Sequence, residues 1–333
     1  MQVAIIGFGY WGPNLVRNFS SVSNCKVKYV CDFRYERLKV VSNLYPTISF
    51  TKNYDEILSD TDVDAVIIAT PVFTHFELAK KALLSGKNVL IEKPMTSNVK
   101  EASELIELSQ KVNKLLMVDH TFLYTGAVQK MKSLIEEDVV GKIKYLDSTR
   151  INLGLFQPDI NVLWDLAPHD ISILNYLIDE IPYSVNATGV SHTNNGIENI
   201  AYLTINYQSG FIAHFNCSWT SPVKIRMMLF GGDKKMMVFN DLEPTEKIRL
   251  YDTGYQHKTD EDKIKVLVDY RVGDVYIPKV DSREALGLMA NDFINCINTH
   301  SKPISNCESG LNVIKILEAA QQSIKQNGKE IKL

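Results

Sequence analysis

The sequence lacks the marks of a disulfide-stabilised secreted protein. It has five cysteines, Cys25, Cys31, Cys217, Cys296 and Cys307, and none of them forms a CxxC pair. Their odd number argues against a complete disulfide framework. We therefore expect a cytoplasmic protein with reduced thiols.

Long apolar runs and an excess of one charge are also missing. The first apolar run, residues 3–6, leads directly into Gly7, so we expect no signal peptide. No run approaches the roughly 18 apolar residues of a membrane span. The formal net charge is -3, with 23% charged residues, which provides no basic surface for nucleic acid. We expect neither a membrane nor a nucleic acid as partner, and we predict no metal site.

The length of 333 residues and the hydrophobic fraction of 45% allow two buried cores, with a cleft between them as the expected site. Residues 1–121 alternate helical patterns with short apolar strands such as VAIIGFG, VKYVCD, DAVIIAT, NVLIEKP and LLMVDH. This alternation predicts an α/β domain with a parallel, doubly wound sheet of roughly six strands. Such a sheet has the size of a complete dinucleotide-binding domain.

The pattern changes in residues 122–333, where alternating strands dominate. They include IKYLDSTRIN, IAYLTINY, FIAHFNCSW and KIRMMLFG, with hairpin turns expected at Ser209-Gly210 and at residues 231–233. This predicts an α+β domain with a large open, mainly antiparallel sheet and helices on one face, completed by helices near 284–299 and 309–326. A sheet with one uncovered face tends to recruit another copy, so we expect a homodimer or homotetramer.

A glycine-rich turn follows the first predicted strand. Gly7, Gly9 and Gly12 form a G-x-G-x-x-G pattern directly before a predicted helix, and Pro13 suits the first turn of that helix. Glycine is needed there for the tight turn, for close approach of the backbone to a pyrophosphate, and for packing of helix on strand. The pyrophosphate would meet the helix N-terminus. The predicted dinucleotide turn consists of Gly7, Phe8, Gly9, Tyr10, Trp11 and Gly12.

The end of the second strand bears on which dinucleotide binds. Asp32 lies 25 residues after Gly7, near where a carboxylate accepts a hydrogen bond from the 2′-hydroxyl of the adenine ribose. A carboxylate repels the 2′-phosphate of NADP, so we favour NAD. Phe33 and Arg34 follow, and the Arg34 guanidinium would accept that phosphate if Asp32 turned away, so NADP stays possible. A simpler explanation of Asp32 is a strand-end cap.

Two further segments follow strands of the first domain. Thr70-Pro71 with His75 comes after one strand, and Glu92-Lys93-Pro94 ends the next. Open α/β sheets bind their ligands at the carboxyl ends of strands. The cofactor site therefore also includes Thr70, Pro71, His75, Glu92 and Lys93. His75 is explained most simply as a residue that packs under the cofactor loop.

Together with Asp165 and His169, these motifs make the chain resemble the glucose-fructose oxidoreductase, inositol dehydrogenase and MocA (Gfo/Idh/MocA) family. Glu92-Lys93-Pro94 matches the family's Glu-Lys-Pro motif, and Asp165 and His169 match its Asp-x-x-x-His motif. The resemblance covers essentially the whole chain in order. It implies a Rossmann domain followed by an open-sheet domain, and NAD(P)-linked oxidation or reduction of a carbinol on a sugar or cyclitol.

The chemistry gives each of three residues a role. Hydride leaves a carbinol easily only if the hydroxyl proton leaves too, and His169 is the candidate base. Lys93 is the candidate cation beside the developing alkoxide, and Asp165 would orient and charge-balance this pair. Plainer explanations are a core or capping histidine for His169, a surface lysine for Lys93 and a helix cap for Asp165.

The four-residue spacing of Asp165 and His169 suggests one helical face, but Pro168 argues against it. Proline belongs in the first turn of a helix and disfavours helical geometry at Ala167, so we expect the helix to open at Pro168. His169 would then lie in the first turn, where the helix dipole favours the neutral imidazole that a base requires. Asp165 would lie in the turn before the helix.

Two segments are candidates for substrate contacts. Residues 118–126 depart from the family, many of whose members carry an arginine with a nearby proline there, so His120 and Tyr124 either face the substrate or pack at the domain junction. In residues 152–164, polar groups such as Asn161 lie among aromatics and suit a polyhydroxylated ring, although a plain polar loop has the same composition. The substrate candidates are His120, Tyr124, Asn152, Gln157 and Trp164.

The segment 152–164 and the glycine turn look like the family branch found with nucleotide-sugar biosynthesis. That likeness implies hydride exchange, at C3, with a nucleotide sugar of the UDP-N-acetylhexosamine or uronate type, in the biosynthesis of surface-polysaccharide sugars. An inositol or free-sugar dehydrogenase is the alternative among enzymes. A non-catalytic, NAD(P)-sensing binding protein is the alternative from another class. Retention of Lys93, Asp165 and His169 speaks against the sensor, because binding alone requires none of them.

Overall fold

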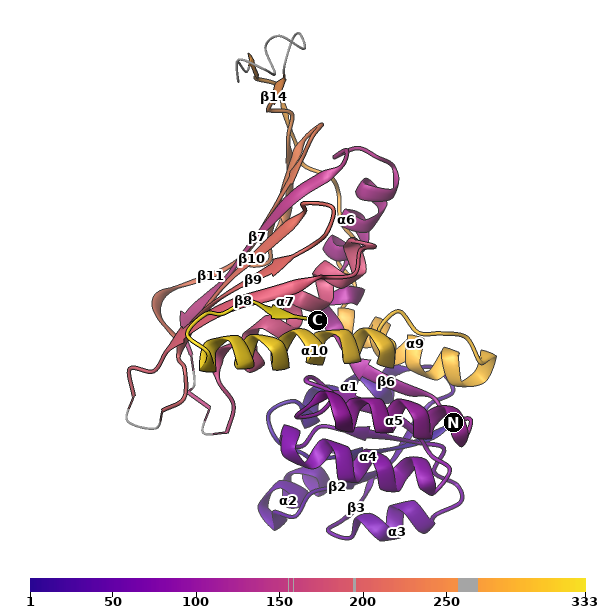
Figure 1. The fold of residues 1–333 in the computed structure, drawn as a ribbon. Coiled ribbons are helices and arrows are strands. Elements are labelled where there is room, and N and C mark those ends of the chain that lie inside the picture. The colour runs from indigo at the N-terminus through magenta and orange to yellow at the C-terminus, as the bar shows by residue number, and fades with distance from the viewer. Residues whose placement is uncertain (155, 158, 194–195, 257–268) are drawn as a thin grey trace. The chain divides into compact units, whose positions relative to one another are not determined.

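The chain forms two compact units, shown in Figure 1. The computed structural model describes residues 1–154, 156–157, 159–193, 196–256 and 269–333. The first unit contains Met1–Thr125 and Arg283–Glu318, and the second contains Gly126–Ser282 and Ala319–Leu333. No helix among these described residues is long and apolar enough to cross a membrane.

The first unit is built on a six-stranded parallel sheet with strand order β3-β2-β1-β4-β5-β6. This order is that of a doubly wound dinucleotide-binding sheet, so the predicted α/β architecture is confirmed. The central strands are fully buried apolar runs, as expected for a sheet covered on both faces. The strands are β1 (Gln2–Ile6), β2 (Lys26–Cys31), β3 (Ser49–Thr51), β4 (Ala65–Ile68), β5 (Asn88–Glu92) and β6 (Leu116–Asp119).

Helices connect these strands, and local sequence signals account for several of their starts. Asn53 and Asn98 cap two helices, because their side chains accept hydrogen bonds from backbone N–H groups at 3.1 and 2.9 Å. Two short 3₁₀ segments, η1 (Val72–Thr74) and η2 (Thr121–Tyr124), follow strands β4 and β6. The helices are α1 (Gly12–Ser21), α2 (Tyr35–Leu44), α3 (Tyr54–Ser59), α4 (His75–Leu84) and α5 (Val99–Lys111).

Two helices from the C-terminal part of the sequence are α9 (Ala285–Thr299) and α10 (Cys307–Lys325). The expected division at residues 121 and 122 assigned both to the second domain, whereas residues 283–318 group with the first unit. The reason is packing of α9 against α1 and η2. Phe293 makes an edge-to-face contact with Phe19, with ring centroids 6.2 Å apart, and Tyr124 donates a hydrogen bond to Asp292 at 2.6 Å.

The second unit is built on a nine-stranded sheet in the order β16-β13-β12-β11-β7-β10-β9-β8-β17. All neighbouring pairs for which a register is described run antiparallel except β7 and β10, so the prediction of an open, mainly antiparallel sheet is confirmed. The predicted turn at Ser209-Gly210 connects β9 to β10. The turn expected at residues 231–233 lies instead at residues 233–235, because Gly231 and Gly232 still belong to β11. Gly210 has a φ of +84°, which favours glycine.

The strands of this sheet are β7 (Ile143–Leu153), β8 (Ser184–Val190), β9 (Ile200–Asn206), β10 (Ile212–Ser218), β11 (Thr220–Gly232), β12 (Met236–Asn240), β13 (Ile248–Tyr251), β16 (Val275–Tyr276) and β17 (Ile331–Lys332). A separate pair consists of β14 (Gly254–Gln256) and β15 (Asp269–Arg271). Two helices, α6 (Gly126–Glu136) and α7 (Val162–Leu177), pack against each other.

One face of the nine-stranded sheet is buried and the other is open. Helix α7 packs on β7, β9 and β10, and residues facing it, such as Leu146, Leu203 and Phe215, are fully or almost fully buried. Their neighbours along the strands point to the opposite face. Tyr145, Tyr202 and Ile212 lie there and are 37 to 46% exposed. The alternation along each strand therefore separates the side chains of the buried face from those of the open face.

The start of α7 shows that one prediction is wrong. The helix begins after Asn161 and contains Pro168 in its interior, instead of opening there. The Asn161 side chain caps it by accepting a hydrogen bond from the Trp164 N–H at 3.1 Å. This cap and burial of the apolar face together outweigh the roughly 3 kcal/mol that an interior proline costs. The buried residues of that face include Val162, Leu163, Ala167, Ile171 and Leu174.

A buried ion pair fixes α7 to the sheet. Arg150 on β7 donates from Nε to both carboxylate oxygens of Asp170 at 3.0 Å, and the two side chains are only 4 and 3% exposed. Ser148 donates a further hydrogen bond to Asp170 at 2.8 Å. Removing one partner of such a pair leaves a buried charge without compensation, which costs far more than losing an exposed pair.

We predict that Asp170→Ala lowers the free energy of unfolding by about 3–5 kcal/mol, measured by urea denaturation. The control is Glu104→Ala, which removes the partly exposed pair between Lys80 and Glu104 and should cost less than about 1 kcal/mol. Equal effects of the two substitutions would show that the Arg150–Asp170 pair does not anchor α7.

Candidate functional site

The glycine turn closes tightly against the end of β4. Gly7 has a φ of +98°, and a Cβ at this position would lie 2.4 Å from the carbonyl oxygen of Ala69. A Cβ at Gly12 would lie 2.8 Å from the Gly7 carbonyl oxygen. Both glycines are therefore required by the backbone itself, at the point where the strand order reverses between β1 and β4.

The middle glycine has a different environment, and this fits a dinucleotide. A Cβ at Gly9 would meet only an Arg34 nitrogen at 3.8 Å, so the protein leaves open space beside this backbone. Helix α1 starts next to it, has a proline in its first turn as predicted, and has no side-chain cap on its N-terminal N–H groups. Open space beside uncapped N–H groups suits a pyrophosphate, so the residues present fit the predicted cofactor.

Asp32, at the end of β2, is buried and fully engaged. Its carboxylate accepts hydrogen bonds from the Phe8 N–H at 2.8 Å and from the Arg34 N–H at 2.9 Å. The Arg34 guanidinium adds two contacts at 3.0 and 2.9 Å. Burial alone would raise the pKa of Asp32, but the hydrogen bonds from Arg34 and Phe8 outweigh it and hold the pKa below its usual value. A ribose hydroxyl must therefore replace a guanidinium contact, because a carboxylate has about four acceptor positions.

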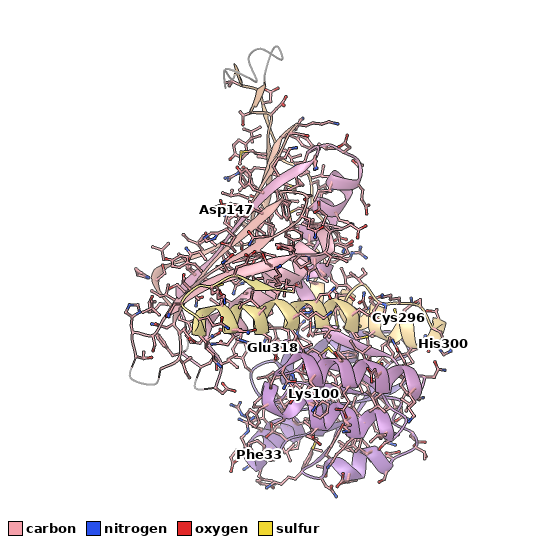
Figure 2. All side chains as sticks on the ribbon, viewed as in Figure 1. Phe33, Lys100, Asp147, Cys296, His300 and Glu318 are labelled. Carbon is pink, nitrogen blue, oxygen red and sulfur yellow. The ribbon has the colours of Figure 1, made fainter. Side chains whose placement is uncertain are left out.

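Three aromatic side chains of the predicted cofactor site are exposed. Tyr10 and Trp11 form an edge-to-face pair with ring centroids 5.6 Å apart. Phe33 is 77% exposed (Figure 2), and the Arg34 guanidinium lies 5.3 Å from the centroid of its ring. Exposed aromatic rings beside a buried carboxylate provide surfaces on which a planar base can stack.

The segment after β4 is fixed to the Glu-Lys-Pro segment by His75. One ring nitrogen of this buried histidine lies 2.8 Å from the Thr70 carbonyl oxygen and the other 3.0 Å from the Pro94 carbonyl oxygen. Burial lowers the pKa of His75. The Thr70 hydroxyl contacts the Thr74 hydroxyl at 2.6 Å, and Pro71 precedes the 3₁₀ segment η1. The sequence-based explanation of His75 as a packing residue therefore agrees with its contacts.

Lys93 directly follows Glu92, the last residue of β5, and the neighbouring strand β6 also ends in an acidic residue, Asp119. Glu92 and Asp119 are register partners on these strands, and Asp119 is 4% exposed. Burial and the neighbouring Asp119 charge raise the pKa of Glu92 well above its usual value. Burial also raises the pKa of Asp119, against the effect of hydrogen bonds from Thr121 and Glu92. The peptide between Lys93 and Pro94 is cis.

The two substrate candidates after β6 differ. Both ring nitrogens of His120 are buried without a hydrogen-bond partner among the described residues, and burial with the nearby Lys93 charge lowers its pKa to about 3. This imidazole is neutral. The Tyr124 hydroxyl, in contrast, donates to Asp292 at 2.6 Å and accepts from the Ser305 N–H at 3.2 Å. Tyr124 is therefore explained by packing within the first unit.

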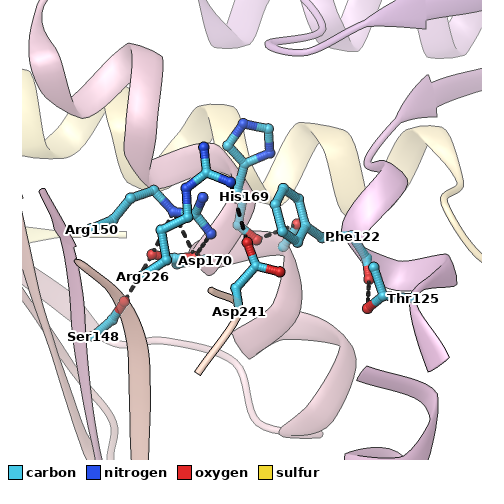
Figure 3. Close-up of polar contacts among 9 residues, drawn as sticks. Phe122, Thr125, Ser148, Arg150, His169, Asp170, Arg226 and Asp241 are labelled. Atoms are coloured by element: carbon cyan, nitrogen blue, oxygen red, sulfur yellow. Dashed lines mark hydrogen bonds and ion pairs between the residues drawn. The ribbon is translucent and has the colours of Figure 1, made fainter. Parts of the chain in front are cut away.

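In the second unit, Asp165 and His169 lie on α7, one turn apart on one face. The Trp219 indole, which is 1% exposed, donates a hydrogen bond to the Asp165 carboxylate at 2.9 Å. His169 directly precedes the anchored Asp170, and Figure 3 shows its ring directed away from the Arg150–Asp170 pair. Because His169 lies inside the helix, the argument from the dipole of a first turn no longer applies.

The remaining substrate candidates lie on or beside β7 and α7. Asn152 is on β7 and Trp164 on α7, and both are half-buried, as is Gln157 between them. Asn161 is the cap of α7 and also donates to Glu198 at 3.0 Å, so its polarity is explained structurally.

Sequence reasoning missed the residues that hold the candidate site in place. Trp219, between β10 and β11, contacts Asp165 across 54 residues of sequence, and Arg150 on β7 contacts Asp170 across 20. Asp119 becomes significant only through its register with Glu92. Glu92 and Asp119 are each at the end of a predicted parallel strand, and this is the one sequence feature that indicates their proximity. No cluster of His, Cys, Asp or Glu suited to a metal ion occurs among the described residues.

Comparisons with known proteins agree with this arrangement. Residues 1–120 match the model of an oxidoreductase family with an NAD-binding Rossmann fold, and residues 128–237 match the GFO/IDH/MocA C-terminal domain. The chain is 30% identical to UDP-N-acetylglucosamine 3-dehydrogenase of Acidithiobacillus ferrooxidans over 97% of this chain and 96% of that protein. It is 23% identical to myo-inositol 2-dehydrogenase of Thermotoga maritima, over 72% of each chain.

Among solved structures, one similar protein is an oxidoreductase from Agrobacterium radiobacter in complex with NAD+, L-tartaric acid and magnesium. It has a TM-score of 0.82 and 16% identity, over 100% of this chain and 98% of that one. At this identity the likeness shows the fold alone. It extends over both units.

The Asp32–Arg34 contacts predict a change of cofactor preference. In Asp32→Ala the guanidinium loses its partner and is available to a 2′-phosphate, so affinity for NADP should rise roughly tenfold relative to NAD. The double variant Asp32→Ala/Arg34→Ala should lose this gain. Dissociation constants for both dinucleotides, measured by calorimetry, test the prediction, and an unchanged NADP/NAD ratio in Asp32→Ala would refute it.

Proposed function

The chain belongs to the Gfo/Idh/MocA oxidoreductase family, and from that membership we propose that it transfers hydride between C3 of a nucleotide sugar and NAD. The protein is an oxidoreductase with an NAD-binding Rossmann domain. The substrate class that we propose is a UDP-N-acetylhexosamine or a related uronate, used to make sugars of surface polysaccharides. This class is supported by the 30% identity to a UDP-N-acetylglucosamine 3-dehydrogenase over nearly the full length of both proteins.

The proposed acid/base residue is His169, with Asp165 as its positioning residue. Bound NAD supplies the hydride acceptor. The hydroxyl proton of the substrate must leave as hydride is removed, and an imidazole that forms a hydrogen bond to this oxygen takes it. The observation that carries the proposal is the helical face shared by Asp165 and His169, with Asp165 held by Trp219 at 2.9 Å.

Lys93 is the proposed cation for the reacting oxygen. It follows β5 at the carboxyl edge of the first sheet, where its charge acts on Glu92, Asp119 and His120. An ammonium group at the developing alkoxide lowers the barrier because the alkoxide charge forms only during the reaction. His120, Asn152, Gln157 and Trp164 remain proposed contacts of the sugar, and Tyr124 is withdrawn from this set.

Two other functions are the alternatives to this proposal. The similarity to myo-inositol 2-dehydrogenase supports an inositol or free-sugar dehydrogenase. This similarity has a lower identity and covers less of the chain than the similarity to UDP-N-acetylglucosamine 3-dehydrogenase. A non-catalytic protein that senses NAD or NADP would require neither His169 nor Asp165. The presence of both residues on one helical face, with Lys93 in the first unit, favours an enzyme over the sensor.

The open sheet face and the cysteines support two further parts of the proposal. We propose a homodimer or homotetramer formed through the face of Tyr145, Tyr202 and Ile212, because these apolar side chains are exposed on a broad sheet. A monomeric mass in sedimentation would rule this out. All five cysteines are free thiols, which supports the proposed cytoplasmic location.

The substrate proposal is tested by incubating the protein with NAD and a panel of UDP-, dTDP- and GDP-sugars, inositols and free sugars. Reduced nicotinamide and product mass are both measured, because a cofactor recycled in place produces no net absorbance change. We expect a UDP-N-acetylhexosamine or its uronate to be altered. Alteration of inositol alone would favour the first alternative, and alteration of no compound would favour the sensor.

With that substrate, we predict that His169→Ala lowers turnover by roughly two to four decades, or ~3–5 kcal/mol in barrier. The dissociation constant for NAD should stay nearly unchanged, because His169 belongs to the second unit. Steady-state kinetics and calorimetry measure the two quantities. Turnover like that of the unsubstituted protein would eliminate His169 as the base.

A further inference from the structure

Arg226 on β11 lies at the rim of the buried face of the nine-stranded sheet. It is the register partner of Arg150 on the adjacent strand β7, so both side chains project from the same face. Met228 and Phe230, further along β11 on that face, are buried. The Arg226 side chain, in contrast, is 35% exposed. The apolar cover of this face therefore ends at Arg226.

The Arg150–Asp170 ion pair connects this position to the proposed base. Asp170 directly follows His169 on α7 and accepts hydrogen bonds from Arg150 at 3.0 Å. Register partners on adjacent antiparallel strands have Cα atoms about 5 Å apart, so Arg226 lies one strand away from this anchor of α7. Figure 3 shows the Arg226 guanidinium and the His169 ring directed to the same side of the ion pair.

The contacts of Arg226 leave most of its hydrogen-bonding capacity unused. A guanidinium has five N–H donors. Within the part of the chain that the structure describes, the Arg226 guanidinium donates to one group, the Asp241 carboxylate, at 3.2 Å. That carboxylate also faces a second cation, because the Lys247 Nζ lies 4.0 Å from it. Two cations share one carboxylate, so this group of three residues has a net positive charge.

The ion pair with Asp241 does not by itself account for this arginine. Arg150, its neighbour, is buried and contacts both carboxylate oxygens of Asp170, which anchors α7. The Arg226–Asp241 pair has one longer contact and is partly exposed, and such pairs contribute about 0–1 kcal/mol to stability. An exposed guanidinium with unused donors is instead suited to carboxylate and phosphate groups, whose geometry matches its planar fork.

We propose that Arg226 binds an oxyanion of the sugar substrate, either the diphosphate of a nucleotide sugar or the carboxylate of a uronate, and so selects anionic sugars over neutral ones. The inference rests on the proposed function, which places the sugar at His169, and it adds a residue that determines specificity. Inositols and neutral free sugars have no such group and gain nothing from Arg226.

The test is equilibrium binding to the protein with NADH bound, a complex in which the sugar cannot be oxidised. Calorimetry, with NMR titration for the free sugars, measures dissociation constants for UDP-N-acetylglucosamine, its C6 uronate, N-acetylglucosamine and the free uronate of N-acetylglucosamine. We expect Arg226→Gln to weaken ligands that carry the bound oxyanion roughly ten- to one-hundredfold, and to change N-acetylglucosamine by less than about twofold. Weakening of both UDP-sugars but not of the free uronate assigns the diphosphate. Weakening of the two uronates alone assigns the carboxylate.

Two further variants make the test specific to the charge of Arg226. Asp241→Asn removes the competing carboxylate, so it should tighten the same ligands by about two- to fivefold, opposite to Arg226→Gln. Arg226→Lys keeps the charge without the planar fork and should retain part of the affinity.

The matched control is Arg249→Gln. Arg249 is 34% exposed and pairs with Glu246 at 2.8 Å, but it lies on the open face, in register with the exposed Asp147 across β12 and β11. This substitution should change none of the dissociation constants.

Unchanged dissociation constants of all anionic ligands in Arg226→Gln, or an equal loss for N-acetylglucosamine, would overturn the proposal. Its failure is distinguishable from failure of the proposed function. Oxidation of a UDP-sugar with unaltered affinity in Arg226→Gln contradicts this inference alone, whereas Arg226-dependent binding without oxidation of any sugar contradicts the hydride transfer alone. If the unsubstituted protein binds none of the anionic ligands, both proposals are wrong.

Discussion

The arrangement of the first unit depends on one constraint: parallel strands end at a common edge of their sheet. Because of it, Gly7 after β1, Asp32 after β2, Ala69 after β4 and Glu92 at the end of β5 come together although they are far apart in the sequence. The glycine turn can close against Ala69 only without a Cβ. The same topology places the dinucleotide site, the Lys93 segment and the neighbouring residues Glu92 and Asp119 at this edge.

The second unit depends instead on how α7 is held against an antiparallel sheet. Arg150 fixes Asp170 from one side of the helix, and Trp219 fixes Asp165 from another. His169 lies between these two anchored positions in the sequence. Burying an ion pair costs desolvation free energy. The Arg150–Asp170 pair nevertheless fixes the rotation of α7 about its axis, which apolar contacts do not. This definition of rotation determines which face carries the proposed base.

Much of the fold and of the candidate site could be predicted from the sequence, because short-range residue patterns determine it. The glycine turn, the strand alternation, the hairpin at Ser209-Gly210 and the buried packing role of His75 follow from residue type and spacing. The start of α7 was predicted wrongly. The prediction considered the free-energy cost of Pro168 inside a helix but not the Asn161 cap and the buried apolar face, which together outweigh it. The contacts of Trp219 with Asp165 and of Asp292 with Tyr124 join distant segments, and residue spacing along the chain does not reveal them.

The central claim is that hydride passes between C3 of a nucleotide sugar and NAD on this protein. The most direct test uses UDP-N-acetylglucosamine carrying deuterium at C3, incubated with NAD and the purified protein, with mass spectrometry of the recovered nicotinamide cofactor. We predict that the reduced cofactor carries the deuterium label. A reduced cofactor without the label, formed while the sugar retains its deuterium at C3, would contradict the account.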